Sequence, residues 1–164
     1  MLISIMRKVA FCAGHRLMHH EGKCANIHGH NYVVEFHVTG SEVDSLGRVV
    51  DFSVLNRLFK GWIDDNWDHG CLVWDEDQAA LSALRQIEPH RVYELPCNPT
   101  AENIARYLLL EIGPQLLEQI PEYELQLTKV VVWETENSSA TVEHSRTNTV
   151  ETKKGSGLLN RKET

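Results

Sequence analysis

No apolar run in the 164-residue sequence approaches the length of about 20 residues that a membrane-spanning helix needs. The amino-terminal segment also differs from a signal peptide, because Arg7 and Lys8 follow the first apolar residues instead of preceding them. We therefore expect a cytoplasmic protein without a membrane partner. Positive charge is scarce as well, with 16 Lys and Arg against 23 Asp and Glu and a net charge of −7. This balance argues against a nucleic-acid partner.

Cys-X-X-Cys pairs are absent, so a structural zinc finger has no support. In a reducing cytosol the four cysteines are expected to be free thiols, ligands or nucleophiles. Histidine, by contrast, is abundant: the chain has nine, and five of them fall between positions 15 and 30. The composition, 42% hydrophobic and 24% charged, is typical of one globular domain with its own core.

Period-two alternation of apolar and polar residues predicts a mainly antiparallel sheet. The alternation is clearest after His28, where His28, His30 and Tyr32 share one face with the apolar residues that follow them. A turn at 45–47 predicts that the chain returns as a hairpin strand. The predicted strands cover residues 2–13, 28–39, 48–52, 125–133 and 140–144.

Two segments have the three- and four-residue spacing of amphipathic helices. The first covers residues 53–65, with Asp51 or Ser53 as its N-cap. The second begins after Thr100, and its apolar stripe falters at Gly113-Pro114. Strands followed by helices and further strands predict an α+β fold, with two helices on one face of the sheet. The other face must then be polar or covered by another subunit.

Two further segments have less regular patterns. The connection over residues 70–98 is long, and residues 78–87 are expected to form a short helix inside it. Residues 146–164 are polar and are expected to form a flexible tail, because they have little apolar surface to bury.

The strongest functional pattern is His28-Gly29-His30. Two histidines at i and i+2 of a strand project to the same side, near enough to bind one ion. His15 follows the first predicted strand and supplies a third ligand if the first two strands are neighbours. Three imidazoles with an open fourth position are typical of catalytic zinc. The alternative is that these histidines merely occupy a loop end.

Cys24 lies four residues before His28, next to Lys23. Cationic neighbours and a metal favour the thiolate, so Cys24 is a candidate base or nucleophile. Alternatively, Cys24 is a fourth zinc ligand, which would close the site.

Two carboxylates are also candidates for the site. In Asp68-His69, the carboxylate can hold one tautomer of the imidazole and relay protons. Glu134 follows a predicted buried strand, where it either marks the exposed strand end or binds an amidine-like ligand edge through two parallel hydrogen bonds.

These residues occur in segments that together resemble the 6-pyruvoyltetrahydropterin synthase/6-carboxytetrahydropterin synthase family. The resemblance extends over about residues 3 to 144, and the Cys-X-X-X-His-Gly-His spacing is similar to that of the bacterial 6-carboxytetrahydropterin synthases of queuosine biosynthesis. The matching segments are Phe11-Cys12-Ala13-Gly14-His15-Arg16-Leu17, Cys24-Ala25-Asn26-Ile27-His28-Gly29-His30-Asn31-Tyr32, Asp68-His69, Pro99-Thr100-Ala101-Glu102-Asn103 and Trp133-Glu134-Thr135.

The resemblance implies a T-fold, in which two helices lie on one face of a four-stranded antiparallel sheet. Residues 1–145 would form this catalytic domain and residues 146–164 the tail. Three subunits would join their sheets into a barrel, and two such trimers would stack into a homohexamer. The implied reaction converts 7,8-dihydroneopterin triphosphate to 6-carboxy-5,6,7,8-tetrahydropterin, with loss of acetaldehyde and triphosphate.

The resemblance also implies roles for individual residues. Zn²⁺ would be bound by His15, His28 and His30, and Cys24 would abstract a proton from the substrate. The other implied residues are His69 as the proton-transfer partner, Asp68 as its orienting group, Glu134 as the pterin anchor, and Thr100 and Glu102 near the ligand and a subunit contact.

Two alternatives stay open. One is another reaction of the family, either elimination to 6-pyruvoyltetrahydropterin or a retro-aldol cleavage. The other is a zinc- or pterin-binding protein without turnover, in which Cys24 is a fourth ligand. The joint presence of Cys24, Asp68, His69 and Glu134 argues against the binding protein. The connection over residues 70–98 is longer than in compact members of the family, and its role is open.

Overall fold

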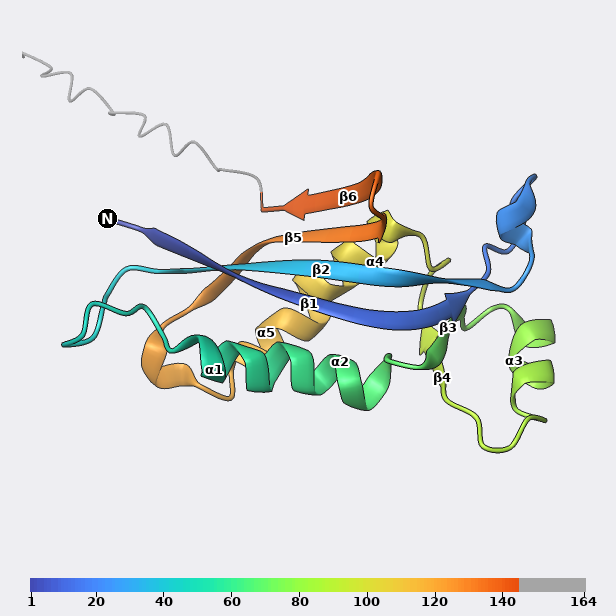
Figure 1. Cartoon of the computed structure of the whole chain (residues 1–164), viewed down its shortest axis with the longest axis horizontal. Coiled ribbons are helices and arrows are strands. Elements are labelled where there is room, and N and C mark those ends of the chain that lie inside the picture. The colour runs from blue at the N-terminus through green and yellow to red at the C-terminus, as the bar shows by residue number, and fades with distance from the viewer. Residues whose placement is uncertain (145–164) are drawn as a thin grey trace, which may run out of the picture.

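The computed structural model describes residues 1–144, and the predicted tail over 146–164 lies outside them. Within the described part, six strands form one sheet in the order β4-β3-β1-β2-β5-β6 (Figure 1). The strands are β1 (Ile3–His15), β2 (His28–Gly40), β3 (Gly70–Trp74), β4 (Val92–Leu95), β5 (Gln126–Thr135) and β6 (Ser138–Glu143). The four strands β1, β2, β5 and β6 pair antiparallel, as the alternation predicted.

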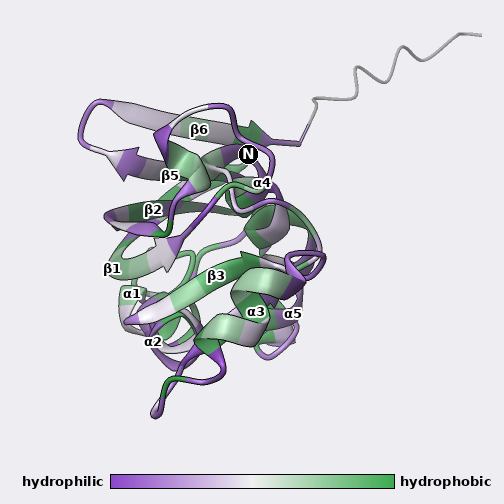
Figure 2. Ribbon diagram, turned by 90° about the vertical axis from the view of Figure 1, so that its right-hand side faces the viewer, coloured by the Kyte–Doolittle hydropathy of each residue, from purple (hydrophilic) through white to green (hydrophobic). Residues whose placement is uncertain are grey.

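The strand count is larger than the four that the T-fold implied, because the connection over residues 70–98 adds two short strands. β3 runs parallel to β1 and pairs with its last three residues, Ala13 to His15, and β4 runs parallel to β3. Between them lies α3 (Gln78–Leu84), which is shorter than the helix predicted over 78–87. Figure 2 shows α3 beside β3, with hydrophobic residues in both elements.

The predicted hairpin strand over 48–52 is wrong. The Asp44 carboxylate accepts the backbone N–H groups of Leu46 and Arg48, so these groups are satisfied inside the turn and not by a neighbouring strand. Asp51 then caps the first helix by accepting the N–H of Ser53 at 2.8 Å. The chain therefore passes directly from the turn into the helix.

The first helical segment runs from Phe52 to Asn66 without a break. It consists of α1 (Phe52–Leu55), a π-helical segment (Asn56–Lys60) and α2 (Gly61–Asn66). It agrees with the helix predicted over 53–65, and Asp51, one of the two proposed caps, is the N-cap.

The second helical segment continues through Gly113-Pro114, where its apolar stripe was expected to falter. It consists of α4 (Ala101–Tyr107), a π-helical segment (Leu108–Ile112) and α5 (Gly113–Leu117). The Gly113 N–H reaches back five residues to the Leu108 carbonyl. This wider turn accommodates the proline, which has no N–H to donate to the helix.

Both helical segments pack on the same face of the sheet (Figure 1). The inward face of β2 is buried there from Tyr32 to Val38, and the ring of Phe36 stacks on Phe59 with 4.2 Å between centroids. On the opposite face of the sheet, α3 packs against Val73 of β3, whereas the neighbouring Leu72 faces the main core. Within residues 1–144, no helix is long and apolar enough to cross a membrane.

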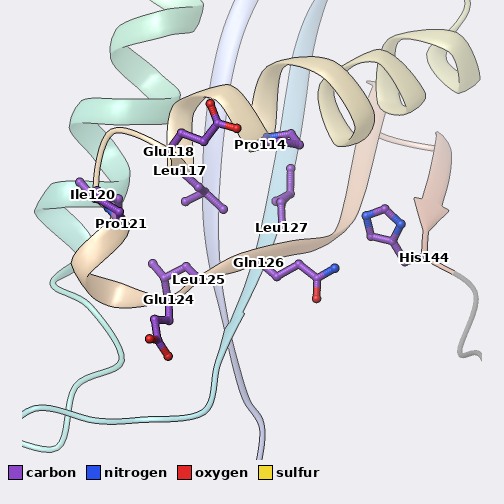
Figure 3. A pocket seen from close by; sticks show the side chains of 10 residues that line it. All are labelled: Pro114, Leu117, Glu118, Ile120, Pro121, Glu124, Leu125, Gln126, Leu127 and His144. Carbon is purple, nitrogen blue, oxygen red and sulfur yellow. The ribbon is translucent and has the colours of Figure 1, made fainter.

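An apolar groove of about 440 Å³ lies between α5, the turn after it and the start of β5 (Figure 3). Leu117, Ile120 and Leu125 contribute to its wall, and His144 stands at one end. None of the predicted site residues lines this groove, so the candidate site lies elsewhere in the fold.

Candidate metal centre and catalytic site

Three histidine side chains converge where β1 ends and β2 begins. His15 is the last residue of β1, and its register partner His28 is the first residue of β2. One ligating nitrogen from each of His15, His28 and His30 lies within 4.8 Å of the other two. The two strands are neighbours, as the sequence argument required, and the three rings have the proximity of a metal-binding group.

Gly29 allows the two strands to meet at this point. A Cβ atom at Gly29 would lie 2.9 Å from the carbonyl oxygen of Ala13 on β1. Any side chain here would push β2 away from β1 and separate His15 from its two partners.

Backbone carbonyls determine which ring nitrogens are free to bind a metal. The Nδ1 atoms of His15 and His28 each lie 2.8 Å from a carbonyl oxygen, that of Pro99 and that of Asn26 respectively. A carbonyl oxygen only accepts hydrogen bonds, so both Nδ1 atoms carry a proton, and in the neutral ring Nε2 then carries the lone pair. These two Nε2 atoms lie 3.1 Å apart. Two facing lone pairs repel each other unless a cation lies between them, so this donor set fits a metal ion.

Electrostatics around His15 favour the neutral, metal-binding imidazole. Burial lowers the pKa of His15 below its ordinary value, and the neighbouring His28 and His30 lower it further, against the opposing effects of the Pro99 carbonyl and Glu134. Neutral imidazole is the form that binds a metal ion. His15 is 1% exposed, so little bulk water competes for its ring.

Tyr32 also faces the histidine group, with its hydroxyl 3.1 Å from Nδ1 of His15. Burial raises the pKa of Tyr32 above its ordinary value, and the charges of Glu134, Cys71 and Cys24 raise it further. The hydroxyl is therefore a neutral phenol. Tyr32 was not among the predicted site residues, although the alternation after His28 puts it on the same strand face as His28 and His30, which was a usable signal.

Glu134 lies on β5 and points toward the histidines. Its Oε1 is 3.6 Å from Nε2 of His15 and 3.9 Å from Nε2 of His30, and its side chain is 28% exposed. The carboxylate thus has a position in the site and does more than mark a strand end. A ligand held by this carboxylate would lie directly beside the three imidazoles.

The start of α4 is tied to the same site. Thr100 caps this helix by accepting the N–H of Asn103, and Glu102 is exposed in its first turn. The residue before Thr100 is Pro99, whose carbonyl contacts His15. Asn98 exchanges two hydrogen bonds with the backbone of Met18, which anchors the loop between β1 and β2. The sequence held no signal for this contact.

Cys24 lies in that loop, within a short 3₁₀ turn (Lys23–Ala25), and is partly exposed. Its carbonyl accepts the N–H of Leu17 at 2.8 Å. Within residues 1–144, the candidate metal-binding group consists of the three histidines and does not include the Cys24 sulfur.

Asp68 and His69 lie between α2 and β3. The Asp68 carboxylate is 2.9 Å from Nδ1 of His69, the arrangement that a proton-relay pair needs. The pKa of Asp68 lies below its ordinary value. The N–H of Cys12, which donates to the other carboxylate oxygen, lowers it, and His69 lowers it further, against the opposing effect of partial burial. The side chain of His69 is 80% exposed. Among residues 1–144, no hydrogen bond or ion pair connects this pair with the three histidines.

Comparison with known proteins identifies the family. The family model described as 6-pyruvoyl tetrahydropterin synthase matches residues 4–145. The chain belongs to the 6-pyruvoyl tetrahydropterin synthase family. This confirms the resemblance inferred from the sequence motifs.

Named relatives and solved structures extend the comparison. The 6-carboxy-5,6,7,8-tetrahydropterin synthase of Rickettsia bellii is 39% identical over 136 residues, which cover 83% of this chain and 96% of the relative. A protein of Wolinella succinogenes has a TM-score of 0.70 at 25% identity, covering 88% of this chain and 99% of that one. The 6-pyruvoyl tetrahydropterin synthase of Caenorhabditis elegans has a TM-score of 0.59 at 28% identity, covering 88% and 96%. The predicted T-fold is therefore confirmed, with β3 and β4 as additions to its sheet.

Proposed function

We propose that this member of the 6-pyruvoyl tetrahydropterin synthase family is a zinc-dependent lyase that acts in the cytoplasm. It converts 7,8-dihydroneopterin triphosphate and one water molecule to 6-carboxy-5,6,7,8-tetrahydropterin in queuosine (7-deazaguanine) biosynthesis, releasing acetaldehyde and triphosphate. The observation that carries the proposal is the convergence of His15, His28 and His30 beside the carboxylate of Glu134. The name of the Rickettsia bellii relative supports this product.

The three histidines would hold the zinc ion through their free ring nitrogens. When bound, zinc supplies a Lewis acid that polarises hydroxyl groups on the substrate side chain. The carbonyls of Pro99 and Asn26 keep two of the rings in the metal-binding tautomer. Glu134 accepts two hydrogen bonds from the 2-amino group and N3–H of the pterin, which fixes the pterin beside the histidines.

Cys24 and His69 move the protons in this proposal. Cys24 takes a proton from the substrate side chain, and His69 exchanges a second proton through Nε2. Asp68 accepts a hydrogen bond from Nδ1 of His69 and so holds the ring in one tautomer. Thr100 and Glu102 lie at the start of α4, next to the Pro99 carbonyl, where they border the ligand.

We further propose a homohexamer built as a dimer of trimers. Within residues 1–144, β1 has a strand partner on its outer edge only from Ala13 onward, and β6 is paired on one side only. Unpaired strand edges are surfaces on which another chain can add a strand. The exposed His69 ring would also gain a neighbouring subunit in such an assembly.

Light scattering tests the assembly. At micromolar concentration the purified protein is expected to have the mass of six chains of 18.7 kDa each. Closed symmetry explains this expectation, because each open edge of one chain is covered by the next chain around the ring. A monomeric mass would contradict the hexamer while leaving the T-fold of the single chain intact.

Product analysis tests the reaction. Purified protein containing zinc is incubated with 7,8-dihydroneopterin triphosphate, and the pterin products are identified by mass spectrometry. We expect 6-carboxy-5,6,7,8-tetrahydropterin together with acetaldehyde and triphosphate. Formation of 6-pyruvoyltetrahydropterin would replace the proposed reaction with elimination. Bound pterin without conversion would indicate a binding protein.

A further inference from the structure

The peptide unit between Asp68 and His69 is held at both of its ends. Its N–H, on His69, donates to the carbonyl of Cys12 on β1 at 2.8 Å. Its carbonyl, on Asp68, accepts from Nη1 of Arg91 at 3.0 Å. Arg91 directly precedes β4 and belongs to the long connection over residues 70–98. Two elements that are distant in sequence thus fix the orientation of one peptide plane.

This peptide plane needs such support, because His69 has a φ of 57°. Left-handed backbone is uncommon for a residue with a side chain and persists where the surroundings enforce it. Rotation of the Asp68–His69 peptide changes the φ angle of His69 and therefore the direction of its imidazole. The contact from Arg91 opposes that rotation.

Arg91 is itself firmly placed. The same Nη1 atom donates to the carbonyl of Asp64 at 2.6 Å. This carbonyl is one of those left without a helical partner at the end of α2. The Arg91 carbonyl accepts the N–H of Cys71, so the backbone of Arg91 is tied to β3. Its aliphatic stem passes Gly70, where a Cβ would lie 3.0 Å from Cγ of Arg91. A larger residue at position 70 would displace the Arg91 side chain, so glycine is needed for this packing.

We propose that Arg91 is a positioning residue for the Asp68–His69 pair. The inference rests on the proposed function and gives the connection over residues 70–98 a role in it. Arg91 holds the end of α2 and the Asp68 carbonyl with one guanidinium nitrogen. The imidazole of His69 then keeps both its direction and its hydrogen bond to the Asp68 carboxylate.

The kinetic test is Arg91→Ala in the zinc-loaded, full-length protein. We expect kcat to fall about 10- to 100-fold, because small misplacements of a catalytic group have costs of this size. KM for 7,8-dihydroneopterin triphosphate and the zinc content should change less than twofold, since Arg91 contacts neither the histidine group nor Glu134. Guanidinium ion added to the variant should restore part of kcat. An unchanged kcat, or a loss that appears only in KM, would overturn the proposal.

Two comparisons separate positioning from general destabilisation. Arg85→Ala removes an exposed arginine of the same connection. Arg85 pairs with Glu94 and not with the Asp68–His69 peptide, so this replacement should leave kcat unchanged. In a His69→Ala background, Arg91→Ala should cause little further loss, because a residue that acts through His69 has nothing left to position. Additive losses would contradict the inference.

A spectroscopic measurement remains informative even if the proposed reaction is absent. In protein labelled with ¹³C at the histidine Cε1 atom, the His69 signal is identified by its disappearance in His69→Ala. Arg91→Ala should shift this signal and Arg85→Ala should not. A shift without turnover in the parent protein would reject the proposed function but keep the positioning role. An unshifted signal would reject the positioning role, whatever the activity.

Discussion

Replacing Cys24 with alanine is expected to give a protein that keeps its zinc and binds pterin but has lost most turnover. A general acid or base typically contributes about 10²- to 10⁴-fold, so kcat should fall by a factor in that range. Zinc should stay bound, because the candidate metal-binding group consists of three histidines and does not include the Cys24 sulfur. Steady-state kinetics, metal analysis and a pterin-binding titration on one preparation measure the three quantities.

Glu134→Ala is the matched control for this experiment. Glu134 is proposed to bind the pterin, so its loss should weaken ligand binding while zinc stays bound. The two variants should therefore have opposite defects: Cys24→Ala binds the ligand without converting it, and Glu134→Ala holds the ligand poorly. If Cys24 were a fourth ligand, its replacement would weaken zinc binding and leave the contacts of Glu134 intact. A Cys24→Ala protein that works near the parent rate would refute the mechanism.

The parts of the fold that the sequence predicted are those with long, regular patterns. The alternation after His28 extends over a whole strand, and its apolar face is the face that the helices bury. Helical spacing over 53–65 likewise agrees with the first helical segment. In both cases many residues contribute to one periodic signal, so a single irregular position does not obscure it.

The incorrect predictions arose where a few local contacts decide the structure. Side-chain acceptors at Asp44 and Asp51 turn the chain into a helix where a hairpin strand was expected. At Gly113-Pro114, where the apolar stripe was expected to falter, the helix continues because the N–H of Gly113 bonds five residues back. Neither the side-chain acceptors nor the wider helical turn repeats along the sequence, so hydrophobic periodicity does not reveal them.

For the site, the spacing of His28 and His30 and the neighbouring strands were sufficient to bring the three histidines together. The contacts that orient the rings could not be inferred. Pro99 is 84 residues from His15 in sequence, and the carbonyl it supplies is present in every residue type. Arg91 is equally inconspicuous, because its role depends on main-chain carbonyls at the end of α2. Side-chain identity predicts ligands better than it predicts the backbone groups that hold them.

Replacing His28 with alanine is expected to remove the metal without unfolding the subunit. Zinc analysis should find about one ion per chain in the parent protein and less than a tenth of that in the variant, because two imidazoles remain where three are needed. His28 lies at the first position of β2 and is only partly buried, so its loss creates no core cavity. Full zinc retention in His28→Ala would refute the metal site.

Thermal unfolding with and without zinc makes the same test independent of metal analysis. Zinc should raise the Tm of the parent protein, since an ion that binds only the folded state stabilises it, and it should leave His28→Ala unchanged. His90→Ala, which changes an exposed histidine outside the group, should behave like the parent. In the metal-free state His28→Ala should be at least as stable as the parent, because it removes one of two lone pairs that face each other at 3.1 Å. A metal-free variant that unfolds well below the metal-free parent would show that His28 serves the fold and not a cation.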